Sequence, residues 1–254
     1  MSKNRNNTPN TSSGNILYGR HPVMAVLNNP RRRISKILCT KDNFDEIKAV
    51  CQQNKINTGI INTVDKKEID RVLPRDAVHQ GFAVYCSELE DYSLEDICIL
   101  ADQKSRCHVL ILDQVTDPQN IGAIIRSCVA FDTLALILQD KNSPAETGTM
   151  AKASAGTIEH LPICRVTNLS RAIQQLKDAG FWTIGMDGYA ETYIDEVNKS
   201  GKTAIIMGSE GKGMRRLVEE SCDMTVKLPI SEKVESLNVS TAAAIALYEM
   251  NKNK

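Results

Sequence analysis

The sequence lacks the features that would point to a membrane, secreted or metal-dependent protein. It contains no apolar run that approaches a membrane span, and its first residues, rich in Asn, Ser and Thr, contain no hydrophobic stretch typical of a signal peptide. We therefore expect the protein to stay in the cytoplasm. The eight cysteines and four histidines show neither a CxxC pair nor metal-ligand spacing, so we expect reduced thiols and predict no metal site.

An excess of charge of one sign is also missing, because 31 Lys and Arg residues balance 31 Asp and Glu residues. A nucleic-acid partner would therefore have to be held by a local basic patch and not by the overall charge. Apolar residues are plentiful, since they make up 42% of the 254 positions. This is enough to build a sizeable core, and the length allows two domains.

The order of sequence patterns predicts two α/β domains. Residues 1–15 have almost nothing to bury, and we expect them to be disordered. Residues 16–87 alternate helix and strand patterns, and an acidic linker with a short helix follows over 88–105. In 106–254, apolar strands separated by helices predict a mostly parallel sheet covered on both faces. Ligands of such sheets bind beyond the carboxyl ends of the strands.

The first of three polar loops at those ends joins the strand pattern HVLILDQV to the helix pattern IGAIIRSCVAF. Asn120 stands at the start of the helix, and Arg126 follows almost two turns later on an otherwise apolar segment. Taken alone, Asn120 is a typical helix cap and Arg126 a typical surface or salt-bridge arginine.

The second loop, MGSEGKGM over residues 207–214, allows a tight turn and a close backbone approach through Gly208, Gly211 and Gly213. A nucleotide-phosphate enzyme would use such a loop as a phosphate cradle. The P-loop pattern GxxxxGK[ST] is absent, however, and Glu210 would repel a phosphate held at a helix N-terminus. Its carboxylate suits a cation or a hydroxyl group, although a lone loop acid is often merely solvated.

The third loop lies in LPISEKVESLNVSTAAAIALYE, over residues 228–249. Ser236, Leu237 and Asn238 open a helix of small residues that can pack closely against a neighbouring backbone. Ser236 or Asn238, taken alone, is again a typical helix cap.

Together, DPQNIGAIIRSC, IIMGSEGKGM and LPISEKVESLNVSTAAAIALYE resemble, in order and spacing, the three signature motifs of the SpoU (TrmH) family of RNA ribose methyltransferases. The first domain, which opens with YGRHPV, resembles the L30e/L7Ae-like substrate-binding domain of the branch that modifies large-subunit ribosomal RNA. The resemblance implies a C-terminal SPOUT-type α/β knot domain with a deep trefoil knot. The periodicity alone predicts an ordinary open sheet, because knots are rare.

The resemblance also implies S-adenosylmethionine as the cofactor and assigns roles to residues of all three motifs. The implied catalytic residues are Asn120, Arg126, Glu210, Ser236 and Asn238. The implied cofactor contacts, made largely through backbone groups, are Gly208, Leu228, Ile230 and Leu237. The turn Ser231, Glu232 and Lys233 departs from the family pattern, which often has a small residue or glycine here, so the backbone shape near the cofactor stays open.

Methyl transfer from a sulfonium to a ribose 2′-hydroxyl is an in-line displacement that needs positioning and removal of one proton, but no metal. In the family, the arginine at the position of Arg126 is the proposed base, held by neighbours such as Asn120, Glu210 and Ser236. Arginine is treated as permanently charged in proteins, so Arg126 would alternatively stabilise the developing alkoxide as a cation. Both roles are left open.

The resemblance favours a guanosine of large-subunit (23S) ribosomal RNA as the substrate, with transfer RNA as the alternative. An RNA-binding protein without catalysis is less favoured, because the motif residues are intact. We expect a homodimer through the catalytic domain, with the Ala-rich last helix at the interface. The densest basic cluster, which we predict to bind RNA phosphates although many basic runs are only solvated, consists of Arg20, Arg31, Arg32, Arg33 and Lys36.

Overall fold

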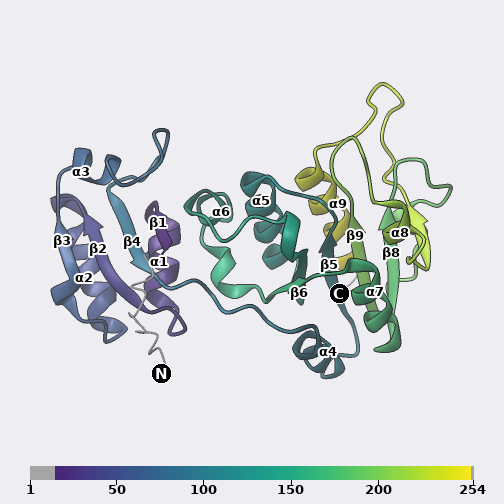
Figure 1. The fold of residues 1–254 in the computed structure, drawn as a ribbon, viewed down its shortest axis with the longest axis horizontal. Helices are drawn as coiled ribbons and strands as arrows, with labels where there is room; N and C mark the ends of the chain where they lie inside the picture. The colour runs from purple at the N-terminus through teal and green to yellow at the C-terminus, as the bar shows by residue number, and fades with distance from the viewer. Residues whose placement is uncertain (1–14, 253–254) are drawn as a thin grey trace, which may run out of the picture.

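The computed structural model describes residues 15–252 and shows two α/β units arranged along the longest axis of the molecule (Figure 1). The disordered tail predicted for residues 1–15 therefore lies outside the described residues, apart from Asn15, which begins the first strand. No helix among residues 15–252 is long and apolar enough to cross a membrane.

The first unit is a four-stranded sheet in the order β1-β4-β2-β3. β4 pairs antiparallel with both β1 and β2, and β2 pairs parallel with β3. The strand β1 was missed from the sequence, because NILY is too short to show alternation. The elements are β1 (Asn15–Tyr18), α1 (Arg20–Asn28), β2 (Ile34–Cys39), η1 (Lys41–Asn43), α2 (Phe44–Gln53), η2 (Thr58–Ile60), β3 (Ile61–Thr63), α3 (Lys66–Asp70) and β4 (Phe82–Cys86).

The second unit is a six-stranded sheet in the order β10-β8-β9-β5-β6-β7, and all its strand pairs are parallel, as predicted. The predicted trefoil knot is not tested by this order and stays a prediction. The elements are α4 (Leu94–Asp102), β5 (Cys107–Leu112), α5 (Pro118–Ala130), β6 (Ala135–Gln139), η3 (Asp140–Asn142), α6 (Gly148–Ala153), η4 (Thr157–His160), β7 (Ile163–Val166), α7 (Leu169–Asp178), β8 (Phe181–Met186), η5 (Ile194–Glu196), β9 (Lys202–Met207), α8 (Arg216–Glu219), β10 (Met224–Val226) and α9 (Val239–Asn251).

The central strand β5 shows how helices cover both faces of this sheet. All six of its residues are buried, and alternate side chains point to opposite faces. Leu110 and Leu112 belong to a core shared with α5 and α9, whereas Val109 and Ile111 belong to a core shared with α4 and α7. A strand buried on both faces reads as a continuous apolar run, which explains why HVLIL shows no alternation of polar and apolar residues.

Candidate functional site

The three polar loops meet because they follow neighbouring parallel strands. β5, β9 and β10 each end at the same edge of the sheet, and only β8 separates β9 from β10. The segments that follow these strands are the turn leading into α5, the glycine-rich loop, and the long loop before α9, which rises above the sheet in yellow-green in Figure 1. This edge is where ligands of parallel sheets bind.

A cavity of about 360 Å³ opens between these loops. Its wall includes all four residues expected to contact a cofactor, which are Gly208, Leu228, Ile230 and Leu237. Glu210 and Ser236 also line it. Sequence reasoning missed residues 186–189 at the end of β8, which also line the cavity. The rule that ligands bind beyond strand ends could have found these residues, because β8 lies next to β9.

Gly208 is required by the close approach of two backbone segments. A Cβ atom added to Gly208 would lie 2.1 Å from the carbonyl carbon of Gly213 and 2.2 Å from the amide nitrogen of Met214. The loop closes on itself through two hydrogen bonds between Ser209 and Gly213, of 2.9 and 3.1 Å. Gly211 and Gly213 have φ values of +78° and +65°, a region that side chains disfavour. The loop thus holds a narrow shape that only glycine permits.

Asn238 joins one residue from each of the three loops. Its side-chain oxygen caps α9 by accepting hydrogen bonds from the Ser240 amide at 2.9 Å and the Ser240 hydroxyl at 2.6 Å. Its side-chain nitrogen donates to Asn120 Oδ1 at 3.1 Å and to Glu210 Oε2 at 3.4 Å. The interpretation of Asn238 as a helix cap is confirmed, and the same side chain also forms the junction between the loops.

Asn120 does not cap its helix. α5 begins at Pro118, and Asp117 is the cap, with its carboxylate accepting a hydrogen bond from the amide of Gln119 at 3.0 Å. The side chain of Asn120 is therefore available for the bond to Asn238.

Arg126 lies apart from this junction. Six residues of α-helix separate it from Asn120 by about 9 Å along the axis and turn it to another side of α5. Its side chain is exposed and forms no hydrogen bond or ion pair with any residue of the described chain. The expectation that Asn120, Glu210 and Ser236 hold Arg126 is thus wrong for this structure. Ser236 is also exposed, and within residues 15–252 its side chain has no hydrogen-bond partner.

An ion pair between a buried carboxylate and a half-buried arginine was missed from the sequence. Asp113 follows β5, is fully buried, and accepts hydrogen bonds from the backbone amide and Nε of Arg215, both at 2.8 Å. Arg215 Nη2 lies 2.7 Å from the same carboxylate and donates to Gln139 at 3.1 Å. The pair ties the segment that leads to Asn120 to the end of the glycine-rich loop. Nothing local could reveal it, because 102 positions separate the partners.

The predicted RNA-binding cluster is divided by the fold. Arg32 is buried, and its guanidinium lies between the carboxylates of Glu146 and Glu159, at 2.5 and 2.6 Å. For Arg32 the prediction of phosphate binding is wrong, because its side chain has no exposed surface to offer. A run of three arginines at the end of a helix does not reveal which of them points inward.

The other four cations of the cluster are exposed. Arg20 pairs with Glu46, and Lys36 lies over the ring of Tyr85 at 6.0 Å. Arg31 donates to the hydroxyl of Tyr92 at 3.1 Å. Arg31 also borders a cavity of about 280 Å³ whose wall includes Glu88, Glu90, Asp91, Asp140 and Glu146, a poor environment for phosphate. Arg33 and Lys36 therefore remain the better candidates for an RNA contact.

The part of the chain that the structure describes shows no arrangement typical of a metal-binding site. Within residues 15–252, no group of three or more His, Cys, Asp and Glu side chains is arranged to hold a metal ion. All eight cysteines are unpaired, and burial raises the pKa of Cys128 and Cys164 to about 12. These two thiols are therefore poor nucleophiles at neutral pH.

The chain matches two families over nearly its whole length. Residues 108–248 match the SpoU rRNA Methylase family, and residues 16–92 match the family of RNA 2′-O ribose methyltransferase substrate-binding domains. The second match covers the unit that was expected to bind RNA.

Named relatives and solved structures agree with these matches. The chain is 36% identical over 242 residues to 23S rRNA (guanosine-2′-O-)-methyltransferase RlmB of Coxiella burnetii, covering 94% of this chain and 95% of the relative. It is 35% identical to an uncharacterized tRNA/rRNA methyltransferase of Synechocystis, covering 92% of this chain but only 62% of that relative. The structure superposes with a TM-score of 0.78 on an AdoMet-bound rRNA methyltransferase from Sinorhizobium meliloti, at 20% identity, covering 94% and 87% of the two chains.

Proposed function

The chain belongs to the SpoU rRNA methylase family, and we propose that it transfers a methyl group from S-adenosylmethionine to a ribose 2′-hydroxyl of RNA. The observation that carries this proposal is the junction of Asn120, Glu210 and Asn238 at the edge of the cavity. It brings one polar side chain from each of the three family motifs to one point.

The cavity suits the cofactor. Its volume of about 360 Å³ lies in the range of small-molecule sites. Leu228, Ile230 and Leu237 offer apolar surface for an adenine ring, and Gly208 lets a ligand approach the backbone. S-adenosylmethionine supplies an electrophilic methyl group on a sulfonium. Glu210 lines the cavity with a carboxylate, which suits a cation or a ribose hydroxyl.

The residues of the junction would orient the nucleophile. Asn238 holds Asn120 and Glu210 in place, so the two can present fixed hydrogen-bonding groups to a ribose. Such positioning is the main contribution that an in-line transfer needs. The family resemblance assigns removal of the proton, or stabilisation of the alkoxide, to Arg126. Because Arg126 lies on another side of α5 than Asn120, this role requires its long side chain to reach the ribose from that side.

We place a homodimer interface on the layer formed by α5 and α9. The two helices pack together, and the ring of Phe131 meets the ring of Tyr248 edge-on at 5.9 Å. Ile245 and Tyr248 are nevertheless 40% and 55% exposed on α9, and Arg126 is exposed on α5. An exposed apolar strip on a helix of small residues suits close packing against a second copy. A stable, active monomer in light scattering would exclude this interface.

We propose a guanosine of large-subunit ribosomal RNA as the target, in the cytoplasm. The support is the substrate-binding family match over residues 16–92 and the 36% identity to a relative named as a 23S rRNA guanosine methyltransferase. Mapping of 2′-O-methylation on total RNA from a deletion strain tests the proposal. We expect one lost methylation in large-subunit RNA. A methyl group lost from a base, or from transfer RNA only, would overturn the target.

A further inference from the structure

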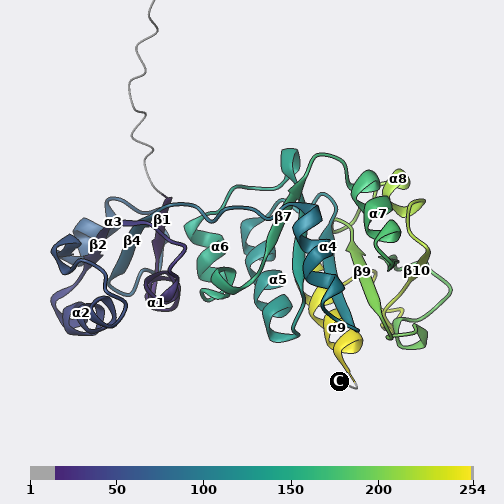
Figure 2. The same ribbon diagram turned by 90° about the horizontal axis from the view of Figure 1, so that it is seen from below.

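The two units of the chain are in close contact at two glycines of the second unit. α6 lies between β1 and the rest of the second unit in both views (Figures 1 and 2). A Cβ atom added to Gly148 of α6 would lie 2.4 Å from the ring of Tyr18, and one added to Gly156 would lie 2.7 Å from Cβ of Ala25. Glycine at these two positions lets the second unit touch the first directly.

Arg32 is buried in the contact between the two units and stabilises it through ion pairs. Its Nη2 lies 2.5 Å from Glu146 and 2.6 Å from Glu159, and its Nη1 donates to the backbone oxygen of Ser87 at 2.5 Å. The arginine and Ser87, which directly precedes the linker, belong to the first unit, and both glutamates belong to the second. The guanidinium has no exposed surface. One side chain therefore holds three parts of the chain together.

The charges at this contact stay paired. Burial lowers the pKa of Arg32, but the two glutamates together outweigh it and hold that pKa above its usual value, so the guanidinium remains charged. Burial raises the pKa of Glu146 despite the arginine beside it. Asn29 adds a hydrogen bond of 2.6 Å to Glu159. Separation of the units would expose these groups one by one and break a bidentate contact, which is the strong form of an arginine–carboxylate pair.

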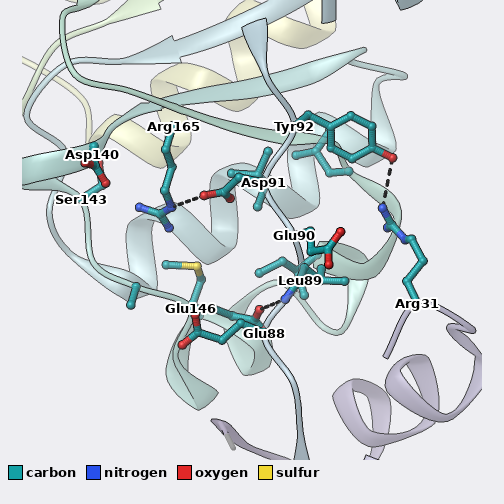
Figure 3. A pocket seen from close by; sticks show the side chains of 15 residues that line it. Arg31, Glu88, Leu89, Glu90, Asp91, Tyr92, Asp140, Ser143, Glu146 and Arg165 are labelled. Carbon is teal, nitrogen blue, oxygen red and sulfur yellow. Dashed lines mark hydrogen bonds and ion pairs between the residues drawn. The ribbon is translucent and has the colours of Figure 1, made fainter. Parts of the chain in front are cut away.

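The linker between the units is fixed as well. Figure 3 shows Arg165 of β7 paired with Asp91 at 3.4 Å, Arg31 bonded to Tyr92, and Glu146 accepting a hydrogen bond from the amide of Leu89. The amide of Tyr92 also donates to the backbone oxygen of Ile163 at 2.8 Å. The segment predicted as a linker thus runs bound along the edge strand and does not act as a loose tether.

We infer that Arg32 is a positioning residue that sets the distance between the RNA held by the first unit and the methyl-transfer site of the second. The inference rests on the proposed function. If the units cannot move, the distance between the RNA-binding surface of the first unit and the cavity of the second unit is fixed. An RNA bound to the first unit then brings only those nucleotides to the cavity that lie at this distance. Selection of the target nucleotide then depends on the contact of Arg32 with Glu146 and Glu159, which we call the lock, as well as on the cavity.

The test releases the lock without leaving a buried charge. In the triple variant Arg32→Met, Glu146→Gln and Glu159→Gln, all three charges are removed together, and glutamine keeps oxygen acceptors for its neighbours. The matched control removes the ion pair Lys202–Asp102, of which Asp102 is 69% exposed, by Lys202→Met and Asp102→Asn. Both full-length proteins are compared with the wild type by small-angle X-ray scattering, by calorimetry with S-adenosylmethionine, and by methylation of a large-subunit ribosomal RNA transcript.

We expect the triple variant to show a larger radius of gyration, unchanged affinity for S-adenosylmethionine and RNA, and a kcat for the transcript at least tenfold lower. A purely structural role would not separate kcat from RNA affinity in this way. An unchanged scattering profile, or released units with wild-type kcat, would overturn the inference. If the triple variant does not fold, Arg32→Lys is measured in the same way, because lysine keeps the charge but cannot span both carboxylates and Ser87. A wild-type enzyme that methylates no RNA would refute the proposed function, while the scattering still decides the lock.

Discussion

Replacement of Gly208 by alanine should close the cofactor cavity to its ligand. The added Cβ atom would lie 2.1 to 2.4 Å from three backbone atoms of Gly213 and Met214. Backbone atoms cannot rotate away as a side chain does, so the loop has to move by more than about 1 Å to reach ordinary contact distance, and overpacking of this kind costs about 1–3 kcal/mol.

The magnitude follows from the two hydrogen bonds that close the loop between Ser209 and Gly213. Each contributes about 1 kcal/mol net, so their loss costs about 2 kcal/mol. Since about 1.4 kcal/mol corresponds to a factor of ten, we expect Gly208→Ala to bind S-adenosylmethionine about 30-fold more weakly. The assay is isothermal titration calorimetry, with the free energy of unfolding measured in parallel by urea.

Gly59→Ala is the matched control, because its Cβ atom would meet only the Asn57 side chain, with the nearest atom at 3.1 Å. This site lies in the first unit, far from the cavity, and the Asn57 side chain can shift. We expect wild-type cofactor affinity for this control. A folded Gly208→Ala protein that binds S-adenosylmethionine as tightly as the wild type would refute the assignment of Gly208 to the cofactor site.

Two further predictions concern RNA. Arg126→Ala should abolish most methyl transfer but leave S-adenosylmethionine affinity nearly intact, because Arg126 does not line the cavity; near-normal turnover with saturating RNA would make Arg126 a structural residue. Arg126→Lys should recover a substantial share if only the positive charge matters, and little if the planar guanidinium is needed. The double variant Arg33→Ala and Lys36→Ala should weaken RNA binding and flatten its salt dependence, as filter binding at several salt concentrations would show; an unchanged slope would remove both residues from the RNA-binding surface.

The sequence was sufficient to predict those elements whose local pattern of apolar residues is typical of only one kind of element. The parallel sheet of the second unit follows from apolar runs such as the one before Asp113, because a strand covered on both faces cannot alternate. The three loops could be placed together because the carboxyl ends of parallel strands share one edge. The α8 helix spans only Arg216–Glu219, and helical spacing is a weak sequence signal over so few residues.

The sequence was not sufficient where the partner of a charged side chain is distant. Arg32 and Glu159 are 127 positions apart, and Asp113 and Arg215 are 102 apart. In the sequence, a basic run or a loop carboxylate looks the same whether its side chains face solvent or a buried partner. Arg32 points inward toward Glu146 and Glu159 of the second unit, whereas Arg33 is exposed.

Asn238 shows that a capping role and a functional role need not be alternatives, and one substitution separates them. An asparagine amide has one oxygen, used here to cap α9, and one NH₂ group, used here to reach Asn120 and Glu210. Asn238→Asp keeps the cap, because aspartate caps helices as well as asparagine does. It loses both donors and places a second carboxylate where the amide lay 3.4 Å from Glu210, a repulsion of about 1 kcal/mol in a water-like dielectric.

Because Asn238 and Glu210 are both exposed, the Glu210 side chain can turn away from this repulsion, so we expect Asn238→Asp to unfold at nearly the wild-type urea concentration. The disturbed junction should nevertheless lose at least about tenfold in methyl transfer. Asn238→Ala should lose the activity and also about 1 kcal/mol of stability, because the cap is gone as well. The measurements are urea denaturation and the rate of methyl incorporation into RNA. If the aspartate variant were fully active, the junction would have no role in the reaction. If both variants lost stability and activity in equal proportion, Asn238 would act only as a cap.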